Sequence, residues 1–491
     1  MQFRFFIFHQ FYKFRIILYA CIFFRHLKRH YAVFEYLGIP GPKPSLLCGN
    51  LPEILQRGQL HAIQEWRKQY GRVFGYFEGY TPVLSVADPE IVKEVLVKDF
   101  QNFTHRKPFP LAPRKSLGLF LENGGQWKRS RALLTPAFSS GKLKQMFNTM
   151  STGVDHLLVN LDKTNEDQPI DIYNLFQSLT LDIIGRCAFG LQTNAQTDRN
   201  DPFLTNIRTL FRTLSTTFIL PLVMVLPFVQ HFIFAIKNVV LLFGMNPVVW
   251  LRNQMREVIN IRKSMGSVDL VHQMLFSDKR TGEPMTEREI VAQSMTFLLA
   301  GYETTSAVLA YLIHLLAHHQ TVQSRLSDEM EQIGKEEINY DTLSDMPYFN
   351  MVFDEVCRLY PTASMIVTRK AATDCIYNKV KIPAGMNVQV DVWGLHHDSD
   401  LWDDPHTFQP ERFSMVNKSN IKSFSFLPFG AGPRNCIGAR FAMLETKIAI
   451  MKVLQKYRFE PLEKGQEELE LVCRGAIVPK NGVHVRVIRK S

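Results

Sequence analysis

The chain is 491 residues long, which by itself suggests about three domains, but no Gly/Ser-rich, Pro-rich or low-complexity linker divides it, so we predict one large folded unit. The formal net charge is +11, and basic residues gather before the first acidic residue, Glu35, which favours contact with an anionic membrane and argues against a nucleic-acid-binding protein. Seven cysteines without C-x-x-C pairs or zinc-like spacing argue against a disulfide framework and indicate a reducing compartment.

The N-terminal segment is rich in Phe and Ile, but polar residues interrupt it, and its longest apolar run covers only 16–24. A helix that spans a bilayer needs about 20 apolar residues, so a tilted or interfacial helix stays open beside a spanning one. The basic cluster 25–30 is typical of the cytosolic side of a membrane anchor. An arginine-containing start without acids is also typical of a mitochondrial transit peptide, which is the alternative. We predict a membrane-associated segment over residues 1–37.

Prolines at 40, 42 and 44 end that segment because they fix φ and prevent a helix, and we predict a single domain over residues 38–491. It should begin with a helix over 60–70, a hairpin with strands over 72–77 and 83–86, and a helix opened by Asp88 and Pro89. Near the C-terminus, alternation over 483–487 after Asn481-Gly482 predicts another hairpin. Helical patterns dominate elsewhere, so the predicted fold class is mainly α with small β-sheets.

The stretch 210–250 is unusually apolar and contains prolines at 221, 227 and 247. Its longest run free of polar side chains, 218–229, is too short and too interrupted to span a bilayer. Buried core helices are one interpretation of this stretch.

A capping box, Thr286-x-x-Glu289, predicts a long helix over 287–318. Midway, the sequence Ala300-Gly301-Tyr302-Glu303-Thr304-Thr305 forms helices poorly, and its hydroxyls bond the backbone or widen a turn. Carboxylates are rarely buried without a reason. Glu303 and Thr304 are therefore candidate functional residues.

Glu355 and Arg358 share one face of a predicted helix that ends before Pro361, and the sequence Pro410-Glu411-Arg412-Phe413 follows downstream. By itself such a pair is common on protein surfaces and contributes little stability.

Cys436 lies in the glycine-rich loop 429–438, directly ahead of a predicted helix over 439–457. Nearby glycines let backbone N–H groups approach the sulfur, the helix N-terminus adds partial positive charge, and Arg434 adds a full charge. Each should lower the pKa of the thiol, so we predict a thiolate that binds a metal. A small buried hydrophobe is the commoner role of a lone cysteine, and a dinucleotide-binding loop fails because the sixth position is Asn435.

The spacing F-x-x-G-x-R-x-C-x-G, made here by Phe429, Gly432, Arg434, Cys436 and Gly438, resembles the cytochrome P450 family, whose cysteine is the proximal haem ligand. The 300–305 motif and the sequence 103–109 are most similar to microsomal members, the vertebrate family 3 and insect family 6 group. The resemblance runs from about residue 38 to the C-terminus. It implies a single haem domain that carries haem b (iron protoporphyrin IX) and no fused reductase.

The resemblance also implies roles for individual residues. Cys436 would be the axial ligand of the haem iron, with Phe429 and Gly438 beside it. The residues that would hold the haem propionates are Arg434, Arg131, Trp127, Arg106 and Arg369. On the opposite side, Thr304 would hold dioxygen and its water chain, Glu303 would relay protons, and Ala300 and Gly301 would leave space. A buried set, Glu355, Arg358 and Arg412, would support the cysteine loop.

Two further regions take a role from the resemblance. The stretch 210–250 would hold roof helices and a membrane-dipping loop that bears Phe228 and Phe232. Substrate-pocket candidates are Phe297, Ala300, Thr304, Ala363, Met365, Ile366 and Ile477. Basic residues that would dock an acidic reductase are Lys128, Arg129, Lys142, Lys144 and Arg440, although an ordinary solvated basic face stays equally open.

The implied function is a haem-thiolate monooxygenase that inserts one oxygen atom of O2 into lipophilic xenobiotics, steroids or fatty acids. No flavin, iron–sulfur or nicotinamide fingerprint is present, so NADPH-cytochrome reductase is the expected partner, with cytochrome b5 as a second donor. A lipophilic small molecule and membrane lipids are the other expected partners, and no nucleic acid. The expected location is the endoplasmic reticulum membrane with a cytosolic catalytic domain. A haem-thiolate isomerase or dehydratase that acts on a hydroperoxide, and a non-enzymatic haem or lipid carrier, are the alternatives.

Overall fold

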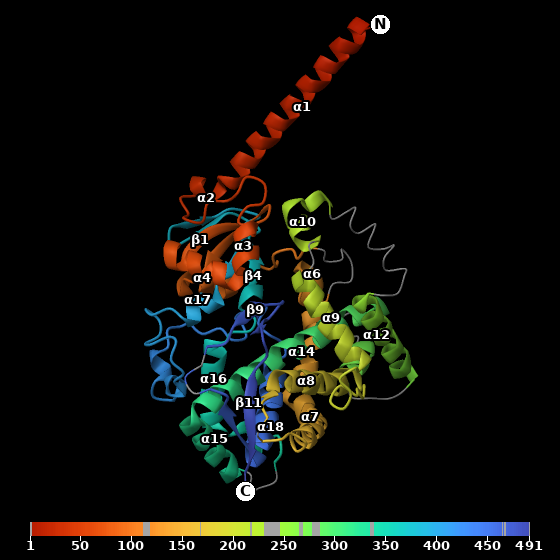
Figure 1. The fold of residues 1–491 in the computed structure, drawn as a ribbon, viewed down its shortest axis with the longest axis vertical. Coiled ribbons are helices and arrows are strands. Elements are labelled where there is room, and N and C mark those ends of the chain that lie inside the picture. The colour runs from red at the N-terminus through yellow and green to blue at the C-terminus, as the bar shows by residue number, and fades with distance from the viewer. Residues whose placement is uncertain are drawn as a thin grey trace.

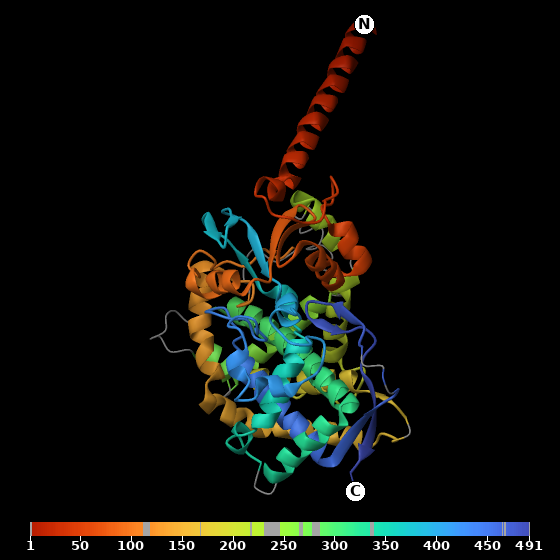
Figure 2. The same ribbon diagram turned by 90° about the vertical axis from the view of Figure 1, so that its left-hand side faces the viewer.

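The computed structural model describes residues 2–110, 118–166, 168–216, 219–229, 246–264, 269–276, 285–333, 338–463, 465 and 468–490. One long N-terminal helix projects from a body built mainly of helices, and the C-terminus lies at the opposite end of that body (Figure 1). A quarter turn leaves this arrangement unchanged (Figure 2). The predicted fold class, mainly α with small β-sheets, is confirmed.

The helices of the described chain follow one another with short connections. They are α1 (Gln2–Tyr31), α2 (Val33–Tyr36), α3 (Leu51–Arg57), α4 (Gln59–Tyr70), α5 (Pro89–Lys93), α6 (Gly124–Leu134), α7 (Ser140–Leu161), α8 (Ile172–Phe189), α9 (Pro202–Thr216), α10 (Ile219–Val225), α12 (Pro247–Ser264), α13 (Leu270–Leu275), α14 (Glu287–His318), α15 (Gln320–Ile333), α16 (Pro347–Leu359), α17 (Val392–His396) and α18 (Ala439–Lys456). Shorter helical turns used below are η1 (Glu94–Lys98), η2 (Thr135–Phe138) and η7 (Pro410–Phe413).

The strands form small separate sheets. The four-stranded sheet has the order β1 (Val73–Glu78), β2 (Thr81–Val86), β7 (Asn387–Val390), β4 (Thr368–Lys370), and only its β2–β7 pair is parallel. A three-stranded sheet has the order β3 (Ile170–Asp171), β11 (His484–Arg489), β8 (Tyr457–Pro461). The two-stranded pairs are β9 (Leu471–Cys473) with β10 (Ile477–Pro479), and β5 (Cys375–Tyr377) with β6 (Val380–Ile382).

Local signals near the start of the domain predicted its elements well. The hairpin forms with a tighter turn than expected, because β1 ends at Glu78 and β2 begins at Thr81. The side chain of Asp88 accepts hydrogen bonds from the N–H groups of Glu90 and Ile91, so α5 begins at Pro89 as predicted.

The predicted hairpin across Asn481-Gly482 is wrong. The segments on its two sides belong to different sheets, since β10 pairs with β9 and β11 pairs with β8 and β3. The Asp171 carboxylate accepts the N–H of Val483 at 3.1 Å, which draws the chain after the turn toward β3. A distant strand therefore outcompetes the neighbouring one.

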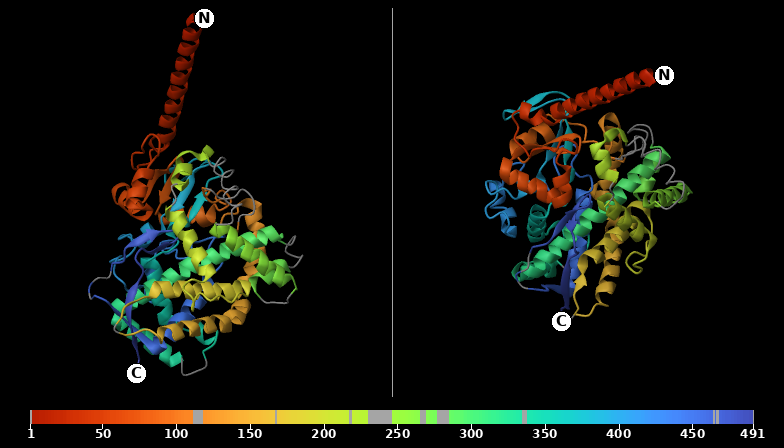
Figure 3. Two further views of the ribbon diagram at one scale, coloured as in Figure 1. Left: turned by 45° about the vertical axis from the view of Figure 1, so that its right-hand side comes forward. Right: turned by 45° about the horizontal axis from the view of Figure 1, so that its top comes forward.

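Helix α14 crosses the middle of the body, as the two views in Figure 3 also show. Its N-terminal capping box is present: Glu289 N–H donates to Thr286 Oγ1 at 3.3 Å, and Thr286 N–H donates to Glu289 Oε2 at 2.8 Å. The helix runs unbroken from Glu287 to His318, so the predicted boundaries are confirmed and a widened turn is not seen. The largest core cluster gathers around α14, α8, α7 and α18.

Helix α1 is continuous over its whole length, although polar residues interrupt its apolar sequence. Apolar side chains are exposed along it from Phe14 to Phe24, whereas Leu27 and Tyr31 pack against the body. His30 stacks on Tyr80 with ring centroids 3.9 Å apart, and its Nε2 donates to the Tyr80 carbonyl oxygen at 2.7 Å. In the described part of the chain, one helix is long and apolar enough to cross a membrane, and it is the mostly buried α14.

Candidate active site

The loop that carries Cys436 is held by its own backbone hydrogen bonds. The N–H of Cys436 donates to the carbonyl oxygen of Phe429 at 2.9 Å, and the N–H of Asn435 donates to Gly432 at 3.0 Å. Gly430 and Gly432 both adopt a φ of 70°, which disfavours any residue with a side chain. A Cβ on Gly432 would also lie 2.0 Å from the carbonyl oxygen of Leu96 in η1, so the loop packs tightly there.

The side chain of Cys436 is exposed to a cavity of about 700 Å³. Helix α6, turn η2 and the start of α18 form its walls. The lining residues are Arg131, Ala132, Thr135, Pro136, Phe138, Ser139, Asn435, Cys436, Ile437, Ala439 and Arg440.

The pKa of the Cys436 thiol is raised, not lowered as the sequence predicted. Desolvation by the surrounding protein raises it, and this outweighs the N–H of Gly438 and the charges of Arg131 and Arg106, which lower it. Arg434 points instead to the carbonyl oxygen of Glu122, to which its Nη2 donates at 2.6 Å. A cationic metal at this sulfur would deprotonate it outright and so supply the charge that the chain lacks.

Three buried arginines come together on one side of this loop. Arg369 N–H donates to Thr368 O at 2.8 Å and Arg106 N–H to Ile366 O at 2.7 Å, yet the Nε atoms of Arg106, Arg369 and Arg434 have no hydrogen-bond partner among the described residues. Burial lowers the pKa of Arg106 to about 10 and that of Arg434 to about 9, and Arg106 repels the other two. Buried, mutually repelling guanidinium groups with free N–H groups fit a ligand that brings two carboxylates.

Two residues of α6 complete this side. The Arg434 guanidinium lies over the Trp127 ring, 4.4 Å from its centroid. Arg131 binds Asn435 twice, donating to its backbone oxygen and to its Oδ1, both at 2.8 Å. Arg131 therefore fixes the residue next to Cys436. Gly438 ends the loop as the N-cap of α18, where a Cβ would only touch Phe138 at 3.9 Å.

Residues 300–304 of α14 divide between two faces of the helix. Ala300 is exposed and Thr304 partly exposed, and Thr304 Oγ1 donates to the Ala300 carbonyl oxygen at 2.7 Å. Glu303 faces α8, where Tyr173 donates to its Oε1 at 2.6 Å. Gly301 also faces α8, since a Cβ there would lie 3.1 Å from Ile184. Glu303 and Thr304 are thus neighbours in sequence without touching through their side chains.

The predicted buried set is present. Arg358 donates from Nε and Nη2 to the two carboxylate oxygens of Glu355 at 2.7 and 2.8 Å, and both side chains are 0% exposed. Arg412 Nε lies 3.4 Å from Glu355 Oε1. Arg358 Nη1 also donates to the backbone oxygens of His396 and Pro405. The pair therefore anchors the polypeptide that leads into the cysteine loop.

Sequence reasoning missed two residues of this scaffold. His396, which it treated as a polar helix end, is fully buried and bonds to the backbone of the cysteine loop. Asn123 Oδ1 accepts the N–H of Arg106 at 2.9 Å and Nη2 of Arg434 at 3.3 Å, so it links two of the arginines. Neither carries a local signal, because their partners lie far away in sequence.

The structure separates the predicted pocket residues. Ala300 and Thr304 share the open face of α14, and Phe297 on that helix packs against Phe138 with ring centroids 5.5 Å apart. Met365 and Ile477 are buried in a core cluster with Trp66 and Tyr76 and neighbouring residues. Ala363 and Ile366 are partly exposed. Phe232 lies outside the described residues, as does the side chain of Phe228.

The predicted basic docking residues differ in how free they are. Arg129 Nη1 pairs with Glu289 at 2.9 Å, and Lys144 pairs with Asp341. Lys142 donates to Gln145 at 3.3 Å and Arg440 to Ser140 at 3.4 Å. Lys128 is exposed and makes no ion pair with the described part of the chain.

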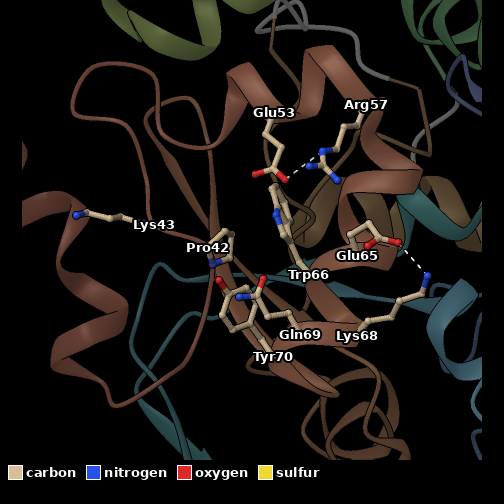
Figure 4. A pocket seen from close by; sticks show the side chains of 9 residues that line it. All are labelled: Pro42, Lys43, Glu53, Arg57, Glu65, Trp66, Lys68, Gln69 and Tyr70. Carbon is tan, nitrogen blue, oxygen red and sulfur yellow. Dashed lines mark hydrogen bonds and ion pairs between the residues drawn. The ribbon is translucent and has the colours of Figure 1, made fainter.

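A second cavity, of about 530 Å³, lies between α3, α4 and the proline-rich segment (Figure 4). Its charged residues pair with one another, Arg57 with Glu53 at 3.4 Å and Lys68 with Glu65 at 2.9 Å. Trp66 and Tyr70 line the remainder, and none of the predicted site residues reaches it.

Comparisons with known proteins agree with this site. The family model for cytochrome P450 matches residues 39–486. The chain is 35% identical over 480 residues to Cytochrome P450 3A11 of Mus musculus, which covers 95% of this chain and 94% of that protein. It is 37% identical over 474 residues to Cytochrome P450 3A29 of Sus scrofa, with 94% and 93% covered. The chain therefore belongs to the cytochrome P450 family, whose members are monooxygenases that carry haem b.

Proposed function

We propose that the chain is a microsomal monooxygenase that inserts one atom of O2 into lipophilic xenobiotics, steroids or fatty acids. NADPH-cytochrome reductase would deliver the electrons, with cytochrome b5 as a second donor. The observation that carries the proposal is the meeting of Cys436, exposed at a cavity, with three buried guanidinium groups that lack a carboxylate. That set matches one thiolate ligand and two propionates.

Each residue of the site then has a role. Cys436 is the axial ligand, and Phe429 and Gly438 shape the loop around it. Arg434, Arg106 and Arg369 bind the propionates, Trp127 supports the Arg434 guanidinium, and Arg131 holds the loop through Asn435. Bound haem supplies the iron at which dioxygen is activated.

On the other side of the cavity, α14 supplies the proton-handling residues. Thr304 presents a hydroxyl that already donates to Ala300 O, so its oxygen is free to accept a hydrogen bond from a water. Glu303 holds a proton, because burial raises the pKa of its carboxyl. Thr304 orients and Glu303 delivers.

We also propose the domain boundary and the location. Residues 1–37 are the membrane-associated segment and residues 38–491 the haem domain. Exposed apolar side chains on α1, followed by Arg25, Lys28 and Arg29, favour insertion into the endoplasmic reticulum membrane with the haem domain in the cytosol. Nothing described supports the mitochondrial alternative.

The test is the reduced carbon-monoxide difference spectrum of the full chain. Wild type should give the strongly red-shifted Soret band of a thiolate ligand, C436S should lose it, and C48S, at a half-buried free cysteine, should keep it. A red-shifted band retained in C436S would overturn the assignment of the ligand. Hydroperoxide turnover without NADPH consumption would favour the isomerase instead.

A further inference from the structure

The carboxyl of Glu303 is held by one residue of another helix. Tyr173, in the first turn of α8, donates its phenol O–H to Glu303 Oε1 at 2.6 Å. Tyr173 is 6% exposed and Glu303 is 3% exposed, so water does not compete for this bond. A short hydrogen bond in a buried setting is stronger than its counterpart at the surface.

The fold fixes Tyr173 independently of Glu303. Its backbone N–H donates to Asp171 Oδ1 at 3.1 Å, and Asp171 also accepts from Val483 at the start of the last strand. Helices α8 and α14 approach closely enough that a Cβ on Gly301 would lie 3.1 Å from Ile184. The phenol is therefore positioned by the helix start and by helix packing, and the carboxyl adapts to it.

The second carboxyl oxygen, Oε2, has no hydrogen-bond partner within the described part of the chain. Burial raises the pKa of Glu303, while Tyr173, Arg474, Arg208 and Gln177, which face the group, lower it. The neighbouring tyrosine hydroxyls of Tyr302 and Tyr311 stay protonated, since burial raises their pKa as well. The balance favours a neutral carboxyl beside two cations.

The hydrogen bond decides where the acidic proton sits. A neutral carboxyl has one O–H and one carbonyl oxygen, and a phenol O–H can donate only to an oxygen lone pair. Because Tyr173 donates to Oε1, the favoured arrangement places the proton on Oε2, the oxygen without a partner. When that proton leaves to a water, the bond from Tyr173 to the resulting carboxylate strengthens.

We propose that Tyr173 is a positioning residue for Glu303: it orients the carboxyl so that Oε2 carries the proton, and it stabilises the carboxylate after the proton has left. The proton passes from Oε2 to water and returns from solvent, and no electrons move. This inference rests on the proposed function, because it takes Glu303 as the residue that delivers protons.

The first test needs no turnover. Infrared difference spectra of the purified full-length protein across a pH series, with E303Q subtracted, report the protonated carboxyl of Glu303. In Y173F the protonated band should persist to higher pH than in wild type, because the bond that favours the carboxylate is gone. The matched control is Y457F, which removes a tyrosine–carboxylate hydrogen bond of 2.5 Å to Asp162 far from α14 and should leave the band unchanged.

The second test uses the reductase-supported reaction. E303Q should lower kcat by about a hundredfold, the size of a lost general acid, and Y173F by about tenfold. The alkaline limb of the kcat profile in Y173F should move to higher pH together with the infrared midpoint. An infrared midpoint that Y173F leaves in place, or that Y457F shifts equally, would overturn the positioning role. A shifted midpoint with an unmoved kcat profile would overturn the link to proton delivery. Loss of the red-shifted Soret band in wild type would instead refute the proposed function.

Discussion

His396 Nε2 accepts the backbone N–H of Leu427 at 2.9 Å, and this bond ties the end of α17 to the start of the cysteine loop. Since Nε2 is the acceptor, the ring proton sits on Nδ1, which lies 3.2 Å from the carbonyl oxygen of Arg358. The neutral imidazole thus joins the buried Glu355–Arg358 pair to the loop that carries Cys436.

Acid should weaken this connection. Burial and the nearby Arg358 charge lower the pKa of His396 to about 3, so below pH 6.5 the unfolded chain binds a proton that the folded chain does not. The stability that His396 contributes is present above pH 6.5 and is lost as the pH falls toward 3, by about 1.4 kcal/mol for each pH unit.

Urea unfolding between pH 7 and pH 4 measures this loss. H396Q keeps an acceptor for Leu427 but does not titrate, so its unfolding free energy should fall less steeply than that of wild type. H484Q, at an exposed histidine of β11, should follow wild type. Equal slopes for wild type and H396Q would refute the connection.

The Glu355–Arg358 pair should be needed for folding. Removing one partner leaves an uncompensated buried charge, so E355Q and R358M should each cost about 3–5 kcal/mol of unfolding free energy. R358K should not restore it, since a lysine cannot bind both carboxylate oxygens and the carbonyls of His396 and Pro405 together.

The control for this prediction is a second glutamate–arginine pair. Glu411 and Arg325 lie 2.7 Å apart, with side chains 42% and 59% exposed. E411Q should therefore cost less than about 1 kcal/mol in the same urea titration. A cost of E355Q as small as that of E411Q would contradict the assigned role.

The two glycines of the cysteine loop should differ in their tolerance of alanine. G430A meets only the backbone strain of its positive φ, about 1–2 kcal/mol, because nothing lies within 4 Å of the added Cβ. G432A has the same strain and also a Cβ 2.0 Å from Leu96 O, so it must push η1 away. Thermal unfolding should rank wild type, G430A and G432A in that order. G432A as stable as G430A would show that η1 yields freely.

Reductase docking is tested best at Lys128. K128E should lower reductase-supported turnover more than peroxide-supported turnover, because Lys128 is exposed and outside every described ion pair. R129E should lower both, since Arg129 binds Glu289, which closes the capping box of α14. Equal losses of the two activities in K128E would leave this surface without a docking role.

The fold was predictable wherever its signals are local. Asp88-Pro89 and the Thr286–Glu289 box mark helix starts within a few residues, and the structure places both helices there. The C-terminal hairpin failed because the partner of β11 is β8, whose residues precede it by more than twenty positions, and no turn signal reports that distance.

The site was predictable as a set of residues but not as a geometry. Glu303 and Thr304 stand next to each other in the motif, yet one helical step turns them to different faces. The arginines were named from the resemblance, whereas Asn123 and His396, which hold the site together, have no motif of their own. Contacts between residues hundreds of positions apart arise only in the folded chain.

The turn between β1 and β2 has neighbours on two sides. Tyr80 stacks on His30 of α1, while its N–H donates to the carbonyl oxygen of Met224 in α10 at 2.8 Å. The projecting helix cannot swing without moving that turn or breaking these contacts. Its lean is thus a property of the folded body, and a bilayer that tips the rod would pull on α10 through a single tyrosine.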